Sequence, residues 1–232
     1  MQKPNNNPVV DIQADAEEIP LTSEESRYRY ISNHFVSPEE CTRLINFADK
    51  ELVLGDGYDG HANPHSETES FYGYTFTAQP KVKLTNDHLL ALKVMQRARK
   101  SVMKHFRLPF LWLDFAHLVM RDPLESTKKI DSEALSHPWH YDDQADHIKH
   151  RTHTAILYLN DNFEGGFTQF KEQSFGPFRK IEPITGRLIA FKVAGNAHAV
   201  TKLIQGKRYV LNMWFSTKLG VWRRHRRIFK PL

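Results

Sequence analysis

Apolar and polar positions alternate along much of the second half of the chain. Four stretches, at 110–120, 151–160, 186–193 and 207–215, read "FLWLDFAHLVM", "RTHTAILYLN", "GRLIAFKV" and "KRYVLNMWF". The turn sequences "DNFEGG", "EPITG" and "IQGK" separate the later stretches. A period of two, rich in β-branched and aromatic residues and bounded by turn formers, is typical of strands. Several apolar strands without intervening helices predict a sandwich or jelly roll.

A helical period stands before these strands, at about 86–106. One face of this segment is apolar, with Ala91, Met95, Ala98, Val102 and Phe106. Such spacing predicts an amphipathic helix. The other side is basic, with Lys93, Arg97, Arg99, Lys100, Lys104 and Arg107. We interpret the basic side as the solvated face of a helix that packs over the sheet, and a nucleic-acid-binding face is the alternative.

A second helix is predicted to begin after Ser37. Ser37 can cap it, Pro38 suits the first helical position, and Glu40 completes a capping box. The preceding Phe35 and Val36 have the character of a short strand. The predicted fold class is therefore mainly β with packed helices, around a jelly-roll core.

The chain divides into three parts. Residues 1–27 are rich in Asn, Pro and acids without a period, and predict a flexible arm. Residues 28–217 form the predicted domain, in which 56–70 has the composition of a loop. Residues 218–232 form a tail with six basic residues and no acid. Taking those six charges from the net charge of +5 leaves −1 for the rest, so the basic character belongs to a tail that could bind an acidic partner.

Composition limits the class of protein. No run approaches the roughly 18 apolar residues that span a bilayer, and the N-terminus shows no apolar segment of a secretory signal. Cys41 is the only cysteine, which excludes an internal disulfide and a cysteine-based zinc site. These features favour a cytoplasmic or nuclear location.

A histidine-rich stretch, "SHPWHYDDQADHIKHRTH" at 136–153, holds the candidate chemistry. His140 and Asp142 are two residues apart, so in an extended segment an imidazole and a carboxylate point to the same side. His198, just after the strand at 186–193, can supply a third ligand from a neighbouring strand. Two histidines and one carboxylate with open positions opposite form the facial triad of non-haem Fe(II) oxygenases.

Arg208 and Tyr158 are candidates to bind an anion near that metal. Arg208 follows His198 by ten residues across "IQGK", which predicts a hairpin with the two on adjacent strands. Because the strand at 207–215 is apolar on both faces, a buried Arg208 needs an anionic partner, such as the distal carboxylate of a dicarboxylate. A buried Tyr158 hydroxyl also needs a partner, and the same carboxylate could serve, with a cross-strand aromatic as the alternative.

These segments together resemble a known family. "SHPWHYD", "THTAILYLNDNFEGG" and "GRLIAFKVAGNAHAVTKLIQGKRYVLNMWF" look like a 2-oxoglutarate/Fe(II)-dependent dioxygenase of the prolyl hydroxylase type, in particular the catalytic domain of the collagen prolyl 3-hydroxylases. The resemblance covers about 37–217 and includes "DGYDGHANPH", "FYGYTF" and "FAHLVMR" upstream.

The resemblance implies specific roles. The iron ligands would be His140, Asp142 and His198, Arg208 would anchor 2-oxoglutarate, and Tyr158 would be its second carboxylate partner. It implies a double-stranded β-helix, and Fe(II), 2-oxoglutarate, O2 and ascorbate as cofactors. The implied reaction is hydroxylation of a prolyl residue in a protein or peptide, with release of succinate and CO2. It also implies the endoplasmic reticulum lumen, although the family's signal peptide, retention sequence and N-terminal helical region are not visible here.

Other residues in these motifs are expected to surround the site. We expect His137, His147, His150 and His153 to line or cover the entrance, with His153 off the inward face of its strand if Thr154 is on it. Asn212 and Trp214 share the face of Arg208, so they are expected to line the pocket, and a place for Trp214 in the core is the equal alternative. Gly165 and Gly166 are expected to serve a turn.

Three further hypotheses remain beside the prolyl hydroxylase. A 2-oxoglutarate oxygenase acting on nucleic acid or a small molecule would suit the basic segments, but "RYVLNMWFS" lacks the second arginine of nucleic-acid demethylases. A non-catalytic jelly-roll module would be expected to lose at least one of the four site residues. A structural zinc site is disfavoured by the absence of cysteine ligands.

Overall fold

The computed structural model describes residues 21–55, 68–76, 84–124, 134–171 and 178–229. Three α-helices are present there: α1 (Pro38–Glu51), α2 (Asn86–Phe106) and α3 (Trp222–Phe229). Short 3-10 helices lie at Glu25–Arg27, Asp146–Ile148 and Leu219–Val221. The strands are β1 (Arg29–Ser32), β2 (Val53–Leu54), β3 (Glu69–Thr75), β4 (Trp112–Pro123), β5 (Leu135–His140), β6 (His153–Tyr158), β7 (Glu164–Gly165), β8 (Thr168–Phe170), β9 (Arg179–Ile181), β10 (Leu188–Lys192), β11 (His198–Thr201), β12 (Leu203–Gln205) and β13 (Arg208–Ser216).

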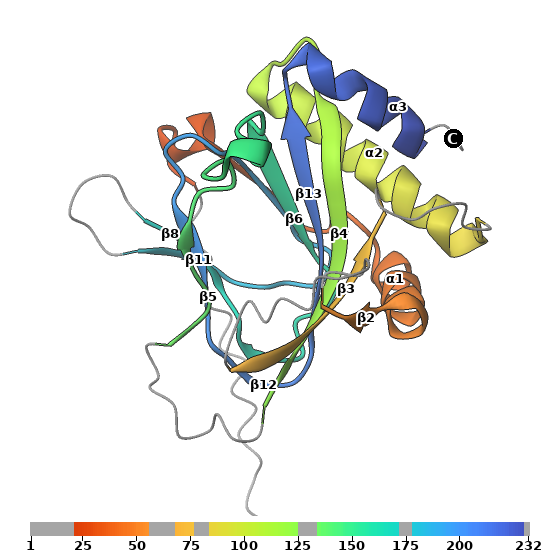
Figure 1. Cartoon of the computed structure of the whole chain (residues 1–232). Coiled ribbons are helices and arrows are strands. Elements are labelled where there is room, and N and C mark those ends of the chain that lie inside the picture. The colour runs from red at the N-terminus through yellow and green to blue at the C-terminus, as the bar shows by residue number, and fades with distance from the viewer. Residues whose placement is uncertain (1–20, 56–67, 77–83, 125–133, 172–177, 230–232) are drawn as a thin grey trace, which may run out of the picture.

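The strands form two main antiparallel sheets. The large sheet has the order β1-β10-β6-β13-β4-β3-β2, and the small sheet has the order β5-β11-β8-β9. The small sheet lies on one side of the large sheet, and the three helices lie on the other side (Figure 1). This arrangement confirms the predicted mainly β class, with a jelly-roll core and packed helices.

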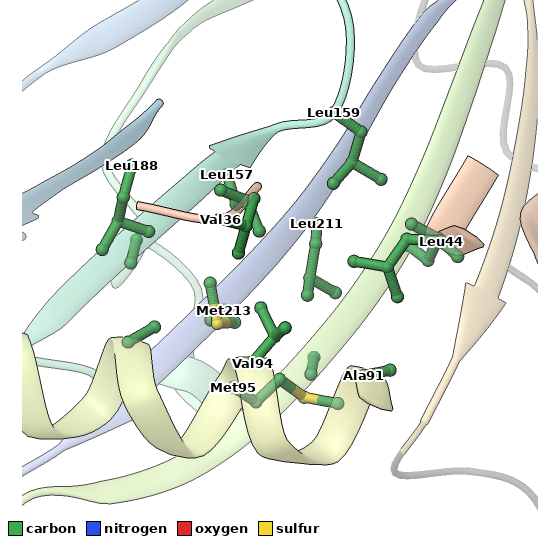
Figure 2. Packing of buried hydrophobic residues seen from close by; sticks show 14 of the residues in the cluster. Val36, Leu44, Ala91, Val94, Met95, Leu157, Leu159, Leu188, Leu211 and Met213 are labelled. Carbon is green, nitrogen blue, oxygen red and sulfur yellow. The ribbon is translucent and has the colours of Figure 1, made fainter. Parts of the chain in front are cut away.

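The main hydrophobic core lies between the large sheet and the helices. Met95 of α2 and Leu44 of α1 pack toward Leu157 of β6 and Leu211 of β13 (Figure 2). These four side chains are buried, at 0% exposure. Burying a side chain of this size stabilises the fold by roughly 1.5–3 kcal/mol, so this layer fixes the large sheet in place.

Both predicted helix starts follow from local sequence. Ser37 caps α1, its side chain accepts from the Glu40 backbone N–H, and the Glu40 side chain accepts from the Ser37 N–H, as the capping box predicted. Thr85 and His88 form the equivalent reciprocal pair at the start of α2. The basic side of α2 is partly neutralised, because Arg97 pairs with Glu40 at 2.8 Å. This ion pair agrees with the interpretation that the basic side of α2 is the solvated face of a helix packed over the sheet.

Two local predictions need correction. Phe35 and Val36 are not a strand, because both N–H groups donate to the Gly186 carbonyl in a turn (2.8 and 3.4 Å). Glu69 and Ser70, expected at the end of a loop, begin β3. The rest of that expected loop, 56–67, lies outside the described residues.

Both predicted domain boundaries lie inside ordered structure. Within the expected N-terminal arm, the Thr22 N–H donates to Glu25 Oε2 (2.8 Å), and Glu25 pairs with Arg29 of β1 (3.4 Å). Residues 1–20 of the arm are not among those described. Much of the expected basic tail is α3, which packs on β4 through His225, whose Nδ1 accepts from the Leu113 N–H (3.2 Å). No helix within the described ranges is long and apolar enough to cross a membrane.

Candidate active site

His140, Asp142 and His198 meet at one end of the small sheet. His140 ends β5 and His198 begins β11, and the two are direct partners in the strand register. Asp142 lies in the turn after β5, not in an extended strand, yet its carboxylate still faces both imidazoles. His140 Nε2 is 3.7 Å from Asp142 Oδ1, and His198 Nε2 is 3.6 Å from Asp142 Oδ2. One ligand atom from each residue lies within 4.8 Å of the other two, which is close enough for one metal ion.

Backbone carbonyls hold both imidazoles in a metal-binding orientation. His140 Nδ1 lies 2.8 Å from the Pro138 carbonyl, and His198 Nδ1 lies 3.1 Å from the Asn196 carbonyl. Because a carbonyl only accepts, Nδ1 carries the proton in each ring and Nε2 keeps its lone pair. Both Nε2 lone pairs are therefore free to bind a metal ion beside the Asp142 carboxylate.

The protonation states also suit a metal. Burial opposes charge on Asp142, but the two imidazoles and the Thr154 hydroxyl outweigh it and hold the pKa of Asp142 well below its usual range. Thr154 Oγ1 donates to Asp142 Oδ2 at 2.6 Å. Burial lowers the pKa of His198, which favours its neutral, metal-binding form. Two imidazoles and a carboxylate fit a ferrous ion with open coordination positions.

A cavity of about 310 Å³ opens beside the triad. Its walls come from both sheets, and they include all three triad residues together with Arg208, Asn212 and Trp214 of β13. Asn212 and Trp214 thus line the pocket, as their shared face with Arg208 predicted. A cavity of this size can hold a small dicarboxylate next to the metal position.

Arg208 is a buried cation in this cavity. It is 2% exposed, its Nε donates to the Gly166 carbonyl (2.9 Å), and its guanidinium lies 5.3 Å from the centre of the Tyr158 ring. Within the described parts of the chain, no carboxylate forms an ion pair with it. A buried guanidinium that has no carboxylate partner in these ranges fits an anionic ligand.

Arg208 and His198 are not on adjacent strands, so the predicted hairpin is wrong. β11 belongs to the small sheet and β13 to the large sheet, and β12 between them pairs with β7. The two residues face one cavity from opposite sheets. Sequence separation suggested a hairpin, but the short β12 takes the chain from one sheet to the other.

Tyr158 is fully buried beside Arg208, but its hydroxyl already has a partner. It donates to Thr168 Oγ1 at 2.6 Å. Tyr158 is not among the residues that line the cavity. Its role as a second carboxylate partner therefore stays a prediction that requires the hydroxyl to leave Thr168.

The other histidines of the stretch have different positions. His137 lines the cavity with its ring 4.1 Å from that of His140, and His147 lies in the 3-10 helix at Asp146–Ile148. His150 Nε2 pairs with buried Asp114 at 2.9 Å. His153 is not at the entrance, because it is buried on the helix side, 5.0 Å from the Phe106 ring. As predicted, it points away from the face of Thr154.

Some cavity residues escaped the sequence interpretation. Arg121 and His117 of β4 and Arg151 before β6 line the cavity, but none was a candidate. The alternation in "FAHLVMR" places His117, Val119 and Arg121 on one face, so two polar residues on the inward face of an apolar strand were the available signal. The turn expected at Gly165 and Gly166 is wrong, because Gly165 ends β7 and pairs with Leu203, and both glycines have positive φ, of 80° and 65°.

Comparisons with known proteins agree with this site. Residues 133–216, which include all of the candidate ligands, match the 2OG-Fe(II) oxygenase superfamily. Prolyl 3-hydroxylase 2 of Rattus norvegicus is 31% identical over 209 residues, which cover 81% of this chain and 29% of that protein. The chain thus spans less than a third of the length of this relative.

Two solved structures share the fold. A prolyl hydroxylase of Trichoplax adhaerens, in complex with a hypoxia inducible factor peptide fragment, has a TM-score of 0.57 and 16% identity, covering 89% of this chain and 88% of that one. The viral collagen prolyl hydroxylase of Paramecium Bursaria Chlorella virus-1, as a 2OG complex, has a TM-score of 0.53 and 19% identity, covering 81% and 95%. These likenesses show a shared fold, and the triad lies inside the segment 133–216 that is similar to the 2OG-Fe(II) oxygenase superfamily.

Proposed function

We propose that the protein is an Fe(II)- and 2-oxoglutarate-dependent dioxygenase that hydroxylates a prolyl residue of a protein or peptide. The observation that carries this proposal is one cavity lined by His140, Asp142 and His198 and by the buried cation Arg208. A metal and a dicarboxylate can therefore bind side by side. Succinate and CO2 would be the products formed from 2-oxoglutarate.

Different residues would bind the metal and the cosubstrate. His140, Asp142 and His198 would hold the ferrous ion on one face, leaving the opposite positions open. Iron held there would supply the activation of O2, with electrons from 2-oxoglutarate. Arg208 would bind the distal carboxylate bidentately, with Tyr158 as its second partner. Thr154 keeps Asp142 oriented by its 2.6 Å hydrogen bond. Ascorbate is proposed as the reductant that keeps the iron ferrous.

The cavity mouth supports a peptide substrate. Tyr141 is exposed and lines the cavity, and the Arg151 guanidinium lies 4.9 Å from the centre of the Trp214 ring. Arg151 is held in place by Asp114 at 3.0 Å. Aromatic walls suit a prolyl ring, and a guanidinium can donate to peptide carbonyls. The peptide bound to the Trichoplax adhaerens neighbour supports the same choice.

The relatives also support a choice of carbon. The similarity to prolyl 3-hydroxylases favours C3 of the prolyl ring. It likewise favours the endoplasmic reticulum lumen over the cytoplasm or nucleus, which imaging of the tagged protein together with a lumenal marker can test.

Peptide oxidation tests the proposal directly. Purified protein with Fe(II), 2-oxoglutarate and ascorbate is incubated with proline-rich peptides, and mass spectrometry follows the gain of one oxygen while succinate is quantified. We expect His140→Ala and Arg208→Ala to abolish both signals. Arg97→Gln is the matched control, because Arg97 pairs with Glu40 on the helix side. Turnover retained in either site variant would contradict the assignment.

Parallel substrates separate the proposal from its alternatives. Methylated single-stranded oligonucleotides and free proline are offered under the same conditions. Oxidation of the oligonucleotide or of free proline, without oxidation of any peptide, would replace the peptide substrate by the nucleic-acid or small-molecule alternative.

A further inference from the structure

Arg121 is a second buried arginine in the cavity that contains Arg208. The two are direct partners in the register of β4 and β13, and both line the cavity. Arg121 is 6% exposed and Arg208 is 2% exposed. Like charges directly opposite each other across two strands destabilise a sheet, and burial increases that cost. A fold that keeps both therefore needs negative charge at this position.

Among the described residues, one carboxylate faces this pair. Arg121 Nη1 lies 3.2 Å from Oε2 of Glu69, whose side chain is fully buried. Burial lowers the pKa of Arg121, Glu69 counters this effect, and the charge of Arg208 adds to it. Among the described residues, no other carboxylate pairs with either arginine. Two cations against one anion leave a surplus of one positive charge.

Glu69 fixes Arg121 from one side only. Glu69 Oε1 accepts from the Leu203 N–H at 3.1 Å and from the Ser136 hydroxyl. Arg121 Nη1 also donates to the Ser136 carbonyl at 3.2 Å, and its guanidinium lies 5.0 Å from the centre of the Phe71 ring. In the described parts of the chain, every hydrogen bond from the Arg121 guanidinium uses Nη1. Nε and Nη2 are thus available to a ligand while Nη1 anchors the side chain.

We propose that Arg121 is a second anion-anchoring residue, which binds the distal carboxylate of the dicarboxylate cosubstrate together with Arg208. This inference rests on the proposed function, since it assigns a further residue to the 2-oxoglutarate pocket. Glu69 acts as the tether that orients Arg121 and limits the surplus charge to one. A cavity with this charge favours a keto acid with a second carboxylate over one without it.

Equilibrium binding tests the role without turnover. The protein is loaded with Mn²⁺, and calorimetry measures Kd for 2-oxoglutarate and for 2-oxobutyrate, which lacks the distal carboxylate. Arg121→Gln is expected to raise the Kd of 2-oxoglutarate about tenfold or more, as loss of a charged hydrogen bond does. The Kd of 2-oxobutyrate should stay within about threefold, and Arg97→Gln should change neither. Equal weakening of the two ligands would overturn the inference.

A second variant separates anchoring from mere support of the fold. Glu69→Gln removes the tether's charge but keeps Arg121, so 2-oxoglutarate should bind at least as tightly as in the wild type. If Arg121 only neutralises Glu69, both single variants weaken binding equally, and the inference fails. Should Arg121→Gln not fold, Glu69→Gln/Arg121→Gln removes both charges of the Glu69–Arg121 pair, so it leaves neither without its partner, and it should show the same loss. Wild-type affinity in that double variant would overturn the inference.

The two proposals fail differently. Absence of 2-oxoglutarate binding in the Mn²⁺-loaded wild type would remove the proposed function itself. Tight binding in the wild type and in every Arg121 variant would remove only the role of Arg121.

Discussion

The two faces of the large sheet use the same strands for opposite purposes. On β6, Ala155 and Leu157 belong to the apolar core under the helices, whereas Thr154 and Ile156 line the cavity. On β13, Leu211 contributes to the core, whereas Arg208 and Asn212 face the cavity. A period of two therefore separates the residues that hold the fold from the residues that form the site.

The comparison shows which changes should affect stability and which should affect binding. The helix side is filled with side chains at 0% exposure, so it is sensitive to lost volume. The cavity side keeps buried charges that the fold itself does not need, such as Arg208. We expect substitutions on the two faces to give separable effects.

The largest expected effect is on the cavity side, where His198→Ala removes one of three ligands. Metal binding should be lost, because the two remaining donors no longer enclose the ion. The melting temperature of the metal-free protein should change little, since the imidazole faces the cavity. Titration with Mn²⁺ followed by calorimetry measures the first quantity, and thermal denaturation with chelator present measures the second. A variant that still binds metal at wild-type affinity would exclude His198 as a ligand.

The matched change on the helix side is Leu157→Ala. Leu157 is 0% exposed in the core against α2, so the substitution should lower the free energy of unfolding by about 2–5 kcal/mol. The folded fraction should keep the metal affinity of the wild type, because the side chain points away from the cavity. Urea denaturation gives the first number and Mn²⁺ titration the second. A large loss of metal affinity in the folded variant would contradict the separation of the faces.

Local sequence signals predicted the elements on which this comparison rests. The capping box at Ser37 and the helical period of 86–106 depend on residues a few positions apart, and α1 and α2 begin where these signals predict. The alternation of β13 likewise placed Asn212 and Trp214 on the face of Arg208, and all three line the cavity. Such features are encoded within one segment, so they need no knowledge of its partners.

Features that depend on distant partners were missed. The hairpin of His198 with Arg208 was wrong, because strand pairing between sheets is not encoded in sequence spacing. Arg121 was overlooked, since its significance comes from Glu69 and from its register with Arg208. The helix α3 was interpreted as a tail because basic residues without an acid dominate its segment, whereas its anchor on β4, His225, depends on a distant partner.

Low pH should reduce the stability of the fold through protonation of His153, which is buried on the helix side. Burial, together with Lys192, lowers the pKa of His153 to about 4, against a usual value of about 6.5. The folded state thus favours the neutral ring, so stability is complete above about pH 6.5 and falls as the pH drops toward 4. At 1.36 kcal/mol per unit, the loss approaches about 3 kcal/mol. Urea denaturation across this range measures it.

A variant isolates this residue from other titrating groups. His153→Phe keeps a ring against Phe106 but cannot accept a proton. The slope of stability against pH should become shallower by the contribution of His153. The contribution of His225 should remain, since burial also lowers the pKa of His225 to about 4. An unchanged slope would show that His153 does not couple acid to unfolding.

The smallest effect is expected from Thr154→Val on the cavity side. The substitution keeps the shape of the side chain and removes its 2.6 Å hydrogen bond to Asp142. Such a supporting contact orients a metal ligand, and its loss weakens metal binding by about tenfold or more. The free energy of unfolding should fall by only about 1 kcal/mol, since one hydrogen bond is lost. Thr154→Ser, which retains the hydroxyl, should restore the Mn²⁺ affinity. If the valine variant bound metal as tightly as the serine variant, Asp142 would be held by its own turn, and the cavity face would need no support from β6.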